Sequence, residues 1–176
     1  PMVNAAKRAE EAGAFLIDIN MGCPVKKIAK RGGGSGLLRE QTLAAEIVRA
    51  VSKAVQIPVT VKTRLGWCEK SSNPIEFGLL LQDSGAQLLT LHGRTRTQAF
   101  TGQADWDSIA RVKEALSIPV IANGDINSPE EALRCLDISG ADGVMVGRGS
   151  LGAPWLIGQI DLAIKGEKVF KTPDSL

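Results

Sequence analysis

The chain has 176 residues, of which 44% are hydrophobic and 23% charged, and its formal net charge at pH 7 is +2. This composition is ordinary for a soluble globular domain, and so small a net charge does not by itself indicate a nucleic-acid-binding protein. Three cysteines and one histidine exclude a complete disulfide framework and a Cys/His zinc site of ordinary spacing, and no apolar run is long enough to span a membrane. We therefore expect free thiols, no metal, no membrane partner and a cytoplasmic location. Because the chain starts at Pro1 rather than at a methionine, we also expect a piece of a longer protein.

A helix followed by a strand is predicted five times along the chain. Gly13 and Gly140 are placed to end helices, and Pro74 stands at a first-turn position. Ser128 and Glu131 have capping-box spacing at the start of the last of these helices. The predicted pairs of helix and strand are 5–12 with 15–20, 43–55 with 57–62, 74–84 with 87–92, 109–116 with 118–123, and 128–139 with 143–146.

Two of these helices have an apolar stripe on one face, which is the signature of a helix that packs on a core. The stripes are Leu43, Ile47, Val51 and Val55 in one helix, and Ile109, Val112 and Leu116 in the other.

The predicted strands are apolar on both faces and alternate with amphipathic helices, which indicates an α/β fold with a parallel sheet buried on both sides. Such units fit either a doubly wound sheet or an incomplete (β/α)8 TIM barrel. Chemically useful residues end every strand, as in barrels, and no dinucleotide-binding fingerprint follows the first strand. We therefore expect a partial TIM barrel that lacks its first strands, with a catalytic domain over residues 1–164 and a polar tail over residues 165–176. The strand-end residues are Asn20, Lys62, His92, Asn123, Gly147 and Arg148.

Cys23 follows the first strand, between Gly22 and Pro24 and just before Lys26 and Lys27. Nearby positive charge lowers the pKa of a thiol, so this position suits a reactive cysteine. The alternative is a small buried hydrophobic residue, since most free cysteines are of that kind.

Lys62 and His92 end apolar strands, where an unpaired buried charge is costly. Lys62 would suit an anion, a phosphate or a polarised carbonyl, and an exposed strand-end lysine is the alternative. His92 leads into a cationic strand exit that contains Arg94 and Arg96, which favours a functional role over a structural one.

The segments Asn123-Gly124-Asp125 and Gly147-Arg148-Gly149 end the last two strands. In barrels, the loops at this place often bind phosphate through backbone N–H groups, and an arginine adds a bidentate donor. Two ordinary turns are the alternative. The glycine-rich residues 31–36 would make either a second phosphate cradle or a mobile loop beside the thiol.

Basic residues follow several strands and are predicted on the catalytic face, which indicates a polyanionic partner. For any one of them, solvated surface charge is the alternative. They are Lys26, Lys27, Lys30, Arg31, Arg64, Arg94 and Arg96.

Together, these motifs resemble the tRNA-dihydrouridine synthases, and the bacterial branch most closely. The resemblance covers nearly the whole chain and rests on ordered matches. They are Asp18-Ile19-Asn20-Met21-Gly22-Cys23-Pro24, Gly33-Gly34-Ser35-Gly36-Leu37-Leu38, Val61-Lys62-Thr63-Arg64, Leu91-His92-Gly93-Arg94-Thr95-Arg96, Ile121-Ala122-Asn123-Gly124-Asp125-Ile126, Val146-Gly147-Arg148 and Gly152-Ala153-Pro154-Trp155.

The resemblance implies an FMN-binding (β/α)8 barrel, of which this chain would hold strands 4 to 8 and would lack strands 1 to 3 and a C-terminal helical domain. It also implies the reaction: NADPH reduces FMN, the flavin passes a hydride to C6 of a uridine in tRNA, and a cysteine protonates C5. The full-length form is expected to be a monomer with tRNA as its partner.

The same resemblance implies a role for each matched residue, with Cys23 as the catalytic acid. Asn20 and Arg64 would hold the uracil, and Lys62 and His92 would contact flavin and base. The other substrate-binding residues would be Lys26, Lys27, Arg94 and Arg96, and the other FMN-binding residues Asn123, Gly124, Asp125, Gly147 and Arg148.

Two other functions fit the residues. A flavin barrel that reduces or oxidises a free pyrimidine would also pair a flavin with an acid. A truncated, non-catalytic RNA-binding module would explain the basic strand exits without chemistry.

Overall fold

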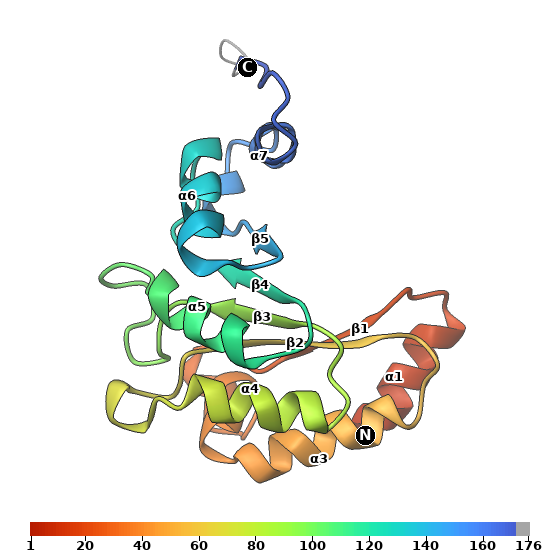
Figure 1. The fold of residues 1–176 in the computed structure, drawn as a ribbon. Coiled ribbons are helices and arrows are strands. Elements are labelled where there is room, and N and C mark those ends of the chain that lie inside the picture. Colours follow the sequence, from red (N-terminus) through yellow and green to blue (C-terminus); the bar gives the residue numbers. More distant parts are fainter. Residues whose placement is uncertain (172–176) are drawn as a thin grey trace.

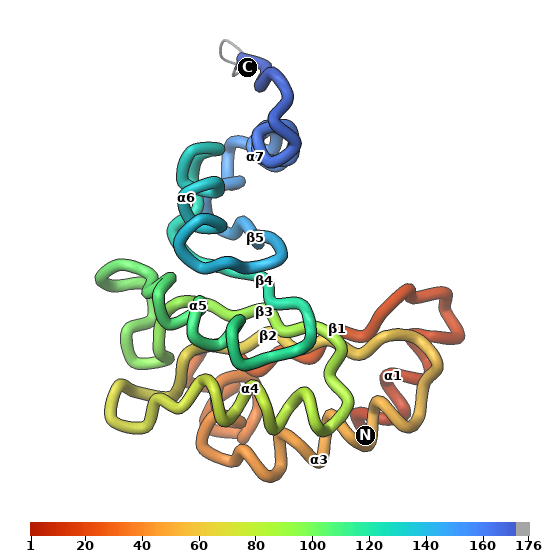
Figure 2. The backbone as a smooth tube through the Cα atoms, viewed as in Figure 1, coloured from red at the N-terminus to blue at the C-terminus, as the bar shows by residue number. Residues whose placement is uncertain are grey.

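The computed structural model describes residues 1–171, in which five strands form one parallel sheet. Helices α3 to α6 follow one another around the sheet, and each packs against the next (Figures 1 and 2). The strands are β1 (Ile17–Asn20), β2 (Val59–Arg64), β3 (Leu89–His92), β4 (Val120–Asn123) and β5 (Gly143–Met145). The α-helices are α1 (Met2–Glu11), α2 (Lys26–Ala29), α3 (Gln41–Ser52), α4 (Pro74–Asp83), α5 (Trp106–Ala115), α6 (Pro129–Ser139) and α7 (Leu156–Ile164), and the 3-10 helices are η1 (Gly34–Arg39), η2 (Glu69–Ser71) and η3 (Arg148–Ser150).

The strands lie in the sheet in the same order as in the chain, β1 to β5. A doubly wound sheet would reverse its strand order at a switch point and carry helices on both faces. Sequential parallel strands with their helices on the outside are the arrangement of a (β/α) barrel. The α/β, partial-barrel prediction is therefore confirmed, and the doubly wound alternative is wrong.

The first strand begins later than predicted. Phe15 is 92% exposed and Leu16 48% exposed, and pairing with β2 starts only at Ile17, whose N–H donates to the Pro58 carbonyl. The predicted strand began at Phe15 because Phe15 and Leu16 are apolar, and no other feature of the sequence marks where the strand starts. The second strand ends later than predicted, because it continues past Lys62 to Arg64.

The apolar stripe of α3 also differs from the prediction. Its buried residues are Ala44, Ala45, Val48 and Val51, whereas Leu43 is 45% exposed. A strict spacing of four drifts around a helix with 3.6 residues per turn, so the true stripe alternates between steps of three and four. The stripe predicted in α5, in contrast, is buried throughout.

The predicted boundary signals of α6 are confirmed. The Ser128 side-chain oxygen accepts a hydrogen bond from the Glu131 N–H, and the Glu131 carboxylate accepts one from the Asn127 N–H. The helix ends at Gly140, which has a left-handed φ of 59° that favours glycine.

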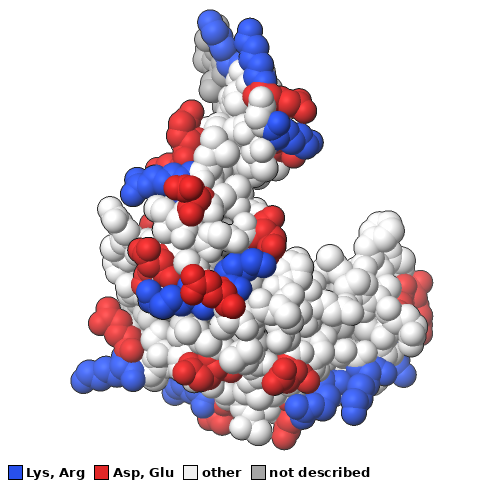
Figure 3. All heavy atoms as spheres, viewed as in Figure 1, with Lys and Arg blue, Asp and Glu red and all other residues white. Residues whose placement is uncertain are grey.

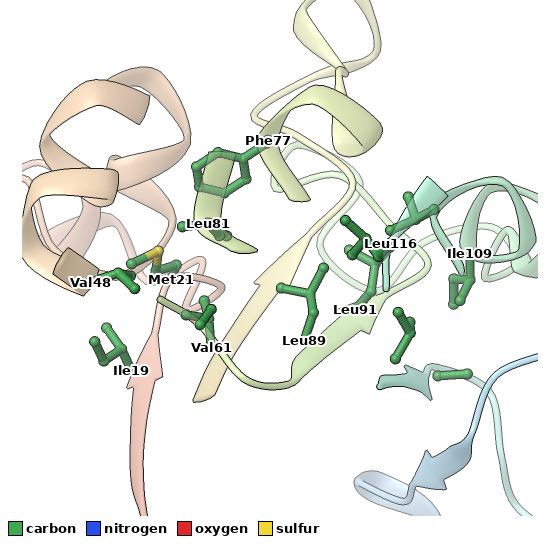
Figure 4. Packing of buried hydrophobic residues seen from close by; sticks show 14 of the residues in the cluster. Ile19, Met21, Val48, Val61, Phe77, Leu81, Leu89, Leu91, Ile109 and Leu116 are labelled. Atoms are coloured by element: carbon green, nitrogen blue, oxygen red, sulfur yellow. The ribbon is translucent and has the colours of Figure 1, made fainter. Parts of the chain in front are cut away.

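The two faces of the sheet differ in character. One face carries Ile19, Val61, Leu89 and Leu91, which pack with Phe77, Leu81 and other helix residues in the core (Figure 4). The opposite face carries alternate residues, and many of these are polar: Asp18, Asn20, Thr60, Lys62, Thr90, His92 and Asn123. The prediction of strands that are apolar on both faces is therefore wrong. The polar residues of this inward face continue to the ends of the strands.

The chain after β5 holds η3 and α7 and then an extended segment. The Gln159 side chain donates to the Phe170 carbonyl, and the Phe170 ring lies against Gly158. The predicted polar tail, 165–176, is described as far as residue 171, and the rest of it lies outside the described residues. No helix of the described chain is long and apolar enough to cross a membrane.

Charge is mixed on the helix-covered side of the molecule. In Figure 3, lysine and arginine side chains lie among aspartate and glutamate over most of this face, and several lysine and arginine side chains adjoin one another along its lower right edge.

Candidate active site

A cavity of about 390 Å³ lies where the strands end, and most of the predicted site residues line it. It brings together residues from five separate strand ends. The predicted residues that line it are Asn20, Cys23, Lys62, Arg64, His92, Asn123, Gly124, Asp125, Gly147 and Arg148.

Strand register explains why these side chains meet. Arg64 is aligned with His92, His92 with Asn123, and Asn123 with Met145. Aligned residues of neighbouring parallel strands point to the same face of a sheet, so these side chains form one row. Asn20 and Lys62 are aligned two residues earlier, on the same face.

Cys23 lies in a short loop, residues 21–24, which we call the Cys23 loop. Asn20 Oδ1 accepts hydrogen bonds from the N–H groups of Gly22 and Cys23, each at 3.0 Å. Arg64 Nε donates to the Gly22 carbonyl at 2.9 Å. The Ser35 N–H donates to the Cys23 carbonyl at 3.0 Å.

The glycine-rich segment supports this loop rather than a phosphate. Residues 34–38 are buried in η1, and a Cβ on Gly34 would stand 2.9 Å from the Cys23 Cβ. No residue of the segment 31–36 is among those that line the cavity. The position of the segment does not support the predicted phosphate cradle, and its residues 34–36 are buried next to the Cys23 loop.

Lys62 lines the cavity and is hydrogen-bonded to a residue of β4. Its Nζ donates to Asn123 Oδ1 at 2.9 Å, and Asn123 Nδ2 donates to the Met145 carbonyl at 2.8 Å. Burial and then the charge of Arg64 lower the pKa of Lys62, and Asp18 partly opposes them. Within residues 1–171, no carboxylate lies within ion-pair distance of this ammonium. An anion, or an electron-rich carbonyl, would complete its coordination.

His92 is neutral in this setting. Burial first, and then the charges of Arg64, Lys62 and Arg94, lower its pKa to about 3, and only Asp125 opposes them. A neutral imidazole has one donor and one acceptor nitrogen, so His92 suits hydrogen bonding to a heterocycle better than donation of a proton from an imidazolium.

Gly124 is required by both conformation and space. Its φ is +121°, and a Cβ there would lie 2.8 Å from the Ala104 Cβ and 2.9 Å from His92 Cδ2. The adjacent Asp125 also has a left-handed φ, 56°. Its two carboxylate oxygens accept hydrogen bonds from Arg94 and from the Ala104 N–H.

Gly147 and Arg148 line the cavity after β5. A Cβ on Gly147 would meet nothing within 4 Å, so its backbone is open to a bound group. The Arg148 side chain is 56% exposed, 3.7 Å from Asp125, and lies over the Phe100 ring at 4.4 Å from the centroid.

Four predicted substrate-binding residues lie outside the cavity. Arg94 is 1% exposed, and its guanidinium donates to Asp125 and to the carbonyls of Thr101 and Gly102. A side chain so deeply buried cannot contact RNA, so the role of Arg94 is structural. The guanidinium of Arg96 lies over the Trp67 ring at 4.5 Å, and Lys26 and Lys27 are exposed on α2.

Phe100 lines the cavity but is absent from the sequence-based predictions. It is 51% exposed, 6.3 Å from the His92 ring between centroids and 5.6 Å from the Arg64 guanidinium. It lies in the long loop between β3 and α5, where the spacing of residues does not indicate which way a side chain points. The only available signal was an aromatic residue in an otherwise polar loop.

The donor set of the cavity is cationic and amide-rich. It contains one ammonium, two guanidiniums and three amide side chains together with open glycine backbone, and these groups suit phosphate and the polar edge of a heterocycle. Among the described residues, no group of three or more His, Cys, Asp or Glu side chains could hold a metal ion.

Comparison with known sequences identifies one family. The family model described as "Dihydrouridine synthase (Dus)" matches residues 1–174. The chain is 60% identical over 168 residues to "Probable tRNA-dihydrouridine synthase 1" of Synechocystis sp., and 48% identical over 160 residues to "tRNA-dihydrouridine synthase B" of Pseudomonas putida. These alignments cover 95% and 91% of this chain but 47% and 48% of the relatives, so the chain spans about half the length of the curated relatives it matches.

Solved structures agree on the fold. Histamine dehydrogenase from Rhizobium sp. 4-9 aligns with a TM-score of 0.69 at 19% identity, over 91% of this chain and 26% of that one. A putative phosphonomutase from Burkholderia cenocepacia aligns with a TM-score of 0.61 at 20% identity, over 81% of this chain and 64% of that one. At these identities, the likeness supports the barrel fold and nothing more.

Proposed function

This chain belongs to the dihydrouridine synthase family, and we propose that the protein containing it reduces uridine in tRNA to 5,6-dihydrouridine with a flavin. The observation that carries the proposal is the cavity itself. It gathers Cys23, Lys62, His92 and Arg148 from four separate strand ends, in one space.

FMN fits the residues present. The open backbone at Gly147 with the exposed Arg148 suits its phosphate, and Lys62, His92 and Asn123, which share one face of the sheet, suit the polar edge of its ring system. When bound, FMN supplies the hydride for C6 of the uracil and takes its electrons from NADPH. Lys62 would favour negative charge on the ring, since no carboxylate within residues 1–171 neutralises its ammonium.

Cys23 would supply the proton. It moves from Sγ to C5 of the uracil as the hydride arrives at C6, so one C–H bond forms at each carbon and the thiolate left behind is reprotonated from solvent. The guanidinium of Arg64, which lies behind the Cys23 loop, would stabilise that thiolate. Neutral His92 would hold the heterocycle by a hydrogen bond and leave the proton transfer to the thiol.

A polymeric substrate is favoured over a free pyrimidine. The relatives at 48–60% identity are named as tRNA-dihydrouridine synthases. The target base in RNA has to leave its stack to reach such a cavity, and a concave site between loops is suited to a flipped base.

For the whole protein we propose a cytoplasmic monomer, in which residues 1–164 form part of the catalytic barrel and residues 165–176 are a polar segment that follows this part in the sequence. Lys26, Lys27 and Arg96, which lie outside the cavity, would contact the RNA around the base. NADPH as the reductant is part of the same proposal.

The test is Cys23→Ala in the full-length protein, compared with Cys68→Ala, which changes a thiol that does not line the cavity. We expect Cys23→Ala to bind flavin normally, as shown by its visible absorbance, and to form dihydrouridine on the order of 100- to 10,000-fold more slowly. Cys68→Ala should retain the normal rate. An unchanged rate in Cys23→Ala would overturn the assignment of the acid, and a colourless full-length protein would overturn the flavin.

A further inference from the structure

The backbone around Cys23 is fully engaged by the protein. The Gly22 N–H and Cys23 N–H donate to Asn20 Oδ1, the Gly22 carbonyl accepts from Arg64 Nε, and the Cys23 carbonyl accepts from the Ser35 N–H. All four backbone polar groups of these two residues therefore have a protein partner.

From this arrangement we infer that Asn20 and Arg64 are positioning residues, which hold the Cys23 loop in one conformation and thereby keep the thiol in the cavity. This inference rests on the proposed role of Cys23 as the acid. It assigns to both side chains a task other than contact with the base.

Asn20 is committed to the loop through its carbonyl oxygen. Oδ1 accepts two hydrogen bonds, which is the number that its two lone pairs accommodate. Only the amide N–H donors of Asn20 are left for any bound molecule. A side chain that bonds backbone N–H groups two and three residues further on fixes a turn in the same way as a cap fixes the start of a helix.

Arg64 ties the loop to the rest of the site. It is 3% exposed, and its Nη1 donates to the Thr95 carbonyl at 3.1 Å and to the Ala99 carbonyl at 2.9 Å, while Nε holds Gly22. Its planar fork thus joins the Cys23 loop to the loop after β3, which carries Phe100. Lysine could keep the charge but could not bridge three carbonyls in fixed directions.

The other side of the loop is closed by η1. There is no room for a side chain at Gly34, because its Cβ would meet the Cys23 Cβ. The N–H of Ser35 donates to the Cys23 carbonyl. With its backbone fixed from β1, β2 and η1, the loop leaves Cys23 only rotation about its own side-chain bond. Proton transfer to carbon needs such placement, because a shift of about 1 Å can lower a rate on the order of 100-fold.

Asn20→Ser and Asn20→Asp in the full-length protein separate the two roles of Asn20. Serine is too short to reach both N–H groups, whereas aspartate keeps the acceptor and loses the amide donors. We expect Asn20→Ser to lower kcat about 10- to 100-fold with little change in the KM for tRNA, as for a misplaced catalytic group. Asn20→Asp should recover most of that loss. If aspartate is as damaging as serine, the amide donors matter and the positioning role is wrong.

A second readout does not depend on tRNA reduction. The alkylation rate of Cys23 by iodoacetamide, measured by peptide mass spectrometry across pH, gives a limiting rate at alkaline pH that reports the placement of the thiol. Asn20→Ser and Arg64→Lys should change this rate at least threefold relative to Cys68 in the same sample. Asn73→Ser and Arg49→Lys are matched controls, since Asn73 bonds Gln41 and Arg49 bonds Ser84, both outside the cavity.

These outcomes keep the two proposals apart. Unchanged alkylation and unchanged kcat in Asn20→Ser and Arg64→Lys would overturn the positioning roles, even if Cys23→Ala is inactive. A changed alkylation rate with full activity in Cys23→Ala would leave the loop inference standing and overturn the proposed acid. If Arg64→Lys fails to fold, the two Asn20 variants decide the question.

Discussion

His92 shows how strongly the environment of one residue sets its chemistry. Three cations and burial keep its imidazole neutral in the folded protein, with a pKa of about 3 against an ordinary value of 6.5. In the unfolded chain the same side chain takes up a proton near pH 6.5. Between these two pH values the unfolded state therefore binds one proton more than the folded state, and stability falls as the pH falls.

We predict that His92→Gln removes this part of the acid sensitivity. Urea unfolding of the full-length protein, measured at pH 7 and then stepwise below pH 6.5, should show a steeper loss of stability in the wild type, by up to about 1.4 kcal/mol per pH unit. The difference between the two proteins should be constant above pH 6.5 and change only below it. Parallel curves throughout the acid range would show that His92 protonates normally.

Gly124 tests whether the shape of the cavity depends on one missing side chain. An alanine there would have an unfavourable φ of +121° and a Cβ within 2.9 Å of His92 Cδ2, whereas Gly140 has φ +59° and nothing within 4 Å. We predict that Gly140→Ala costs about 1 kcal/mol of unfolding free energy. Gly124→Ala should cost a further 1–3 kcal/mol or so, because a well-packed site has to shift.

Flavin content provides a second measure of Gly124→Ala. Because the added methyl group would displace the His92 ring, we expect the purified variant to carry less flavin than wild type. Gly140→Ala, far from the cavity, should carry the same amount as wild type. Equal stability and flavin content in both variants would contradict the close contact at Gly124.

At the scale of elements, the ion pair of Arg94 and Asp125 joins the loop after β3 to the end of β4. Its two hydrogen bonds are 2.8 and 2.6 Å long, and the side chains are 2% and 30% exposed. Burial raises the pKa of Asp125, but the hydrogen bonds from Arg94 and Ala104 and the nearby positive charges outweigh it and hold this pKa below its ordinary value. The pair therefore holds together the two strand ends that carry His92 and Gly124.

We predict that Asp125→Asn lowers the unfolding free energy by about 3 kcal/mol, the low end for a broken buried pair because Asp125 is partly exposed. The matched control is Asp161→Asn, which breaks an exposed pair with Lys165 one helical turn away and should cost about 0.5 kcal/mol or less. Denaturant unfolding of the full-length variants measures both. Equal costs would show that the Arg94 pair is not structural.

At the scale of the whole molecule, the order of helices and strands could be predicted from the sequence, because apolar runs and glycine stops repeat in a fixed sequence. The placement of Lys62, His92 and Asn123 could be predicted for the same reason, since parallel strands end at one edge. The enclosure of Arg94 could not, because its partner Asp125 lies 31 positions further along the chain. Phe100 was not predicted, because a loop has no periodic pattern of apolar residues that shows which side chains face the site.

The polarity of the inward face was also missed, for a reason that applies to the whole sheet. Asp18 and Thr60 are polar residues within strands that were predicted to be apolar on both faces, and the Thr60 hydroxyl donates to Asp18 Oδ1 across the inward face at 2.7 Å. A single strand does not reveal which of its alternate residues will face the helices. That follows only from neighbouring strands in register.

The sheet has two open edges in the described chain, at β1 and at β5, because each pairs with one neighbour only. Next to the β1 edge, Phe15 and Leu16 are exposed apolar side chains. Unpaired strand edges beside apolar surface are sites where a second chain adds by backbone pairing. We therefore predict that this 176-residue chain, when purified alone, associates in a concentration-dependent way.

Sedimentation velocity over a range of concentrations measures this association. The variant Phe15→Lys/Leu16→Lys should shift the chain towards monomer without loss of stability, because neither side chain is buried and charge at a strand edge opposes pairing. Lysines placed at Ile157 and Ile164 of α7, which are also exposed but far from the edge strand β1, should leave association unchanged. A monomer at every concentration would show that the β1 edge is protected by its own loop, and equal effects of the two double variants would place the contact elsewhere.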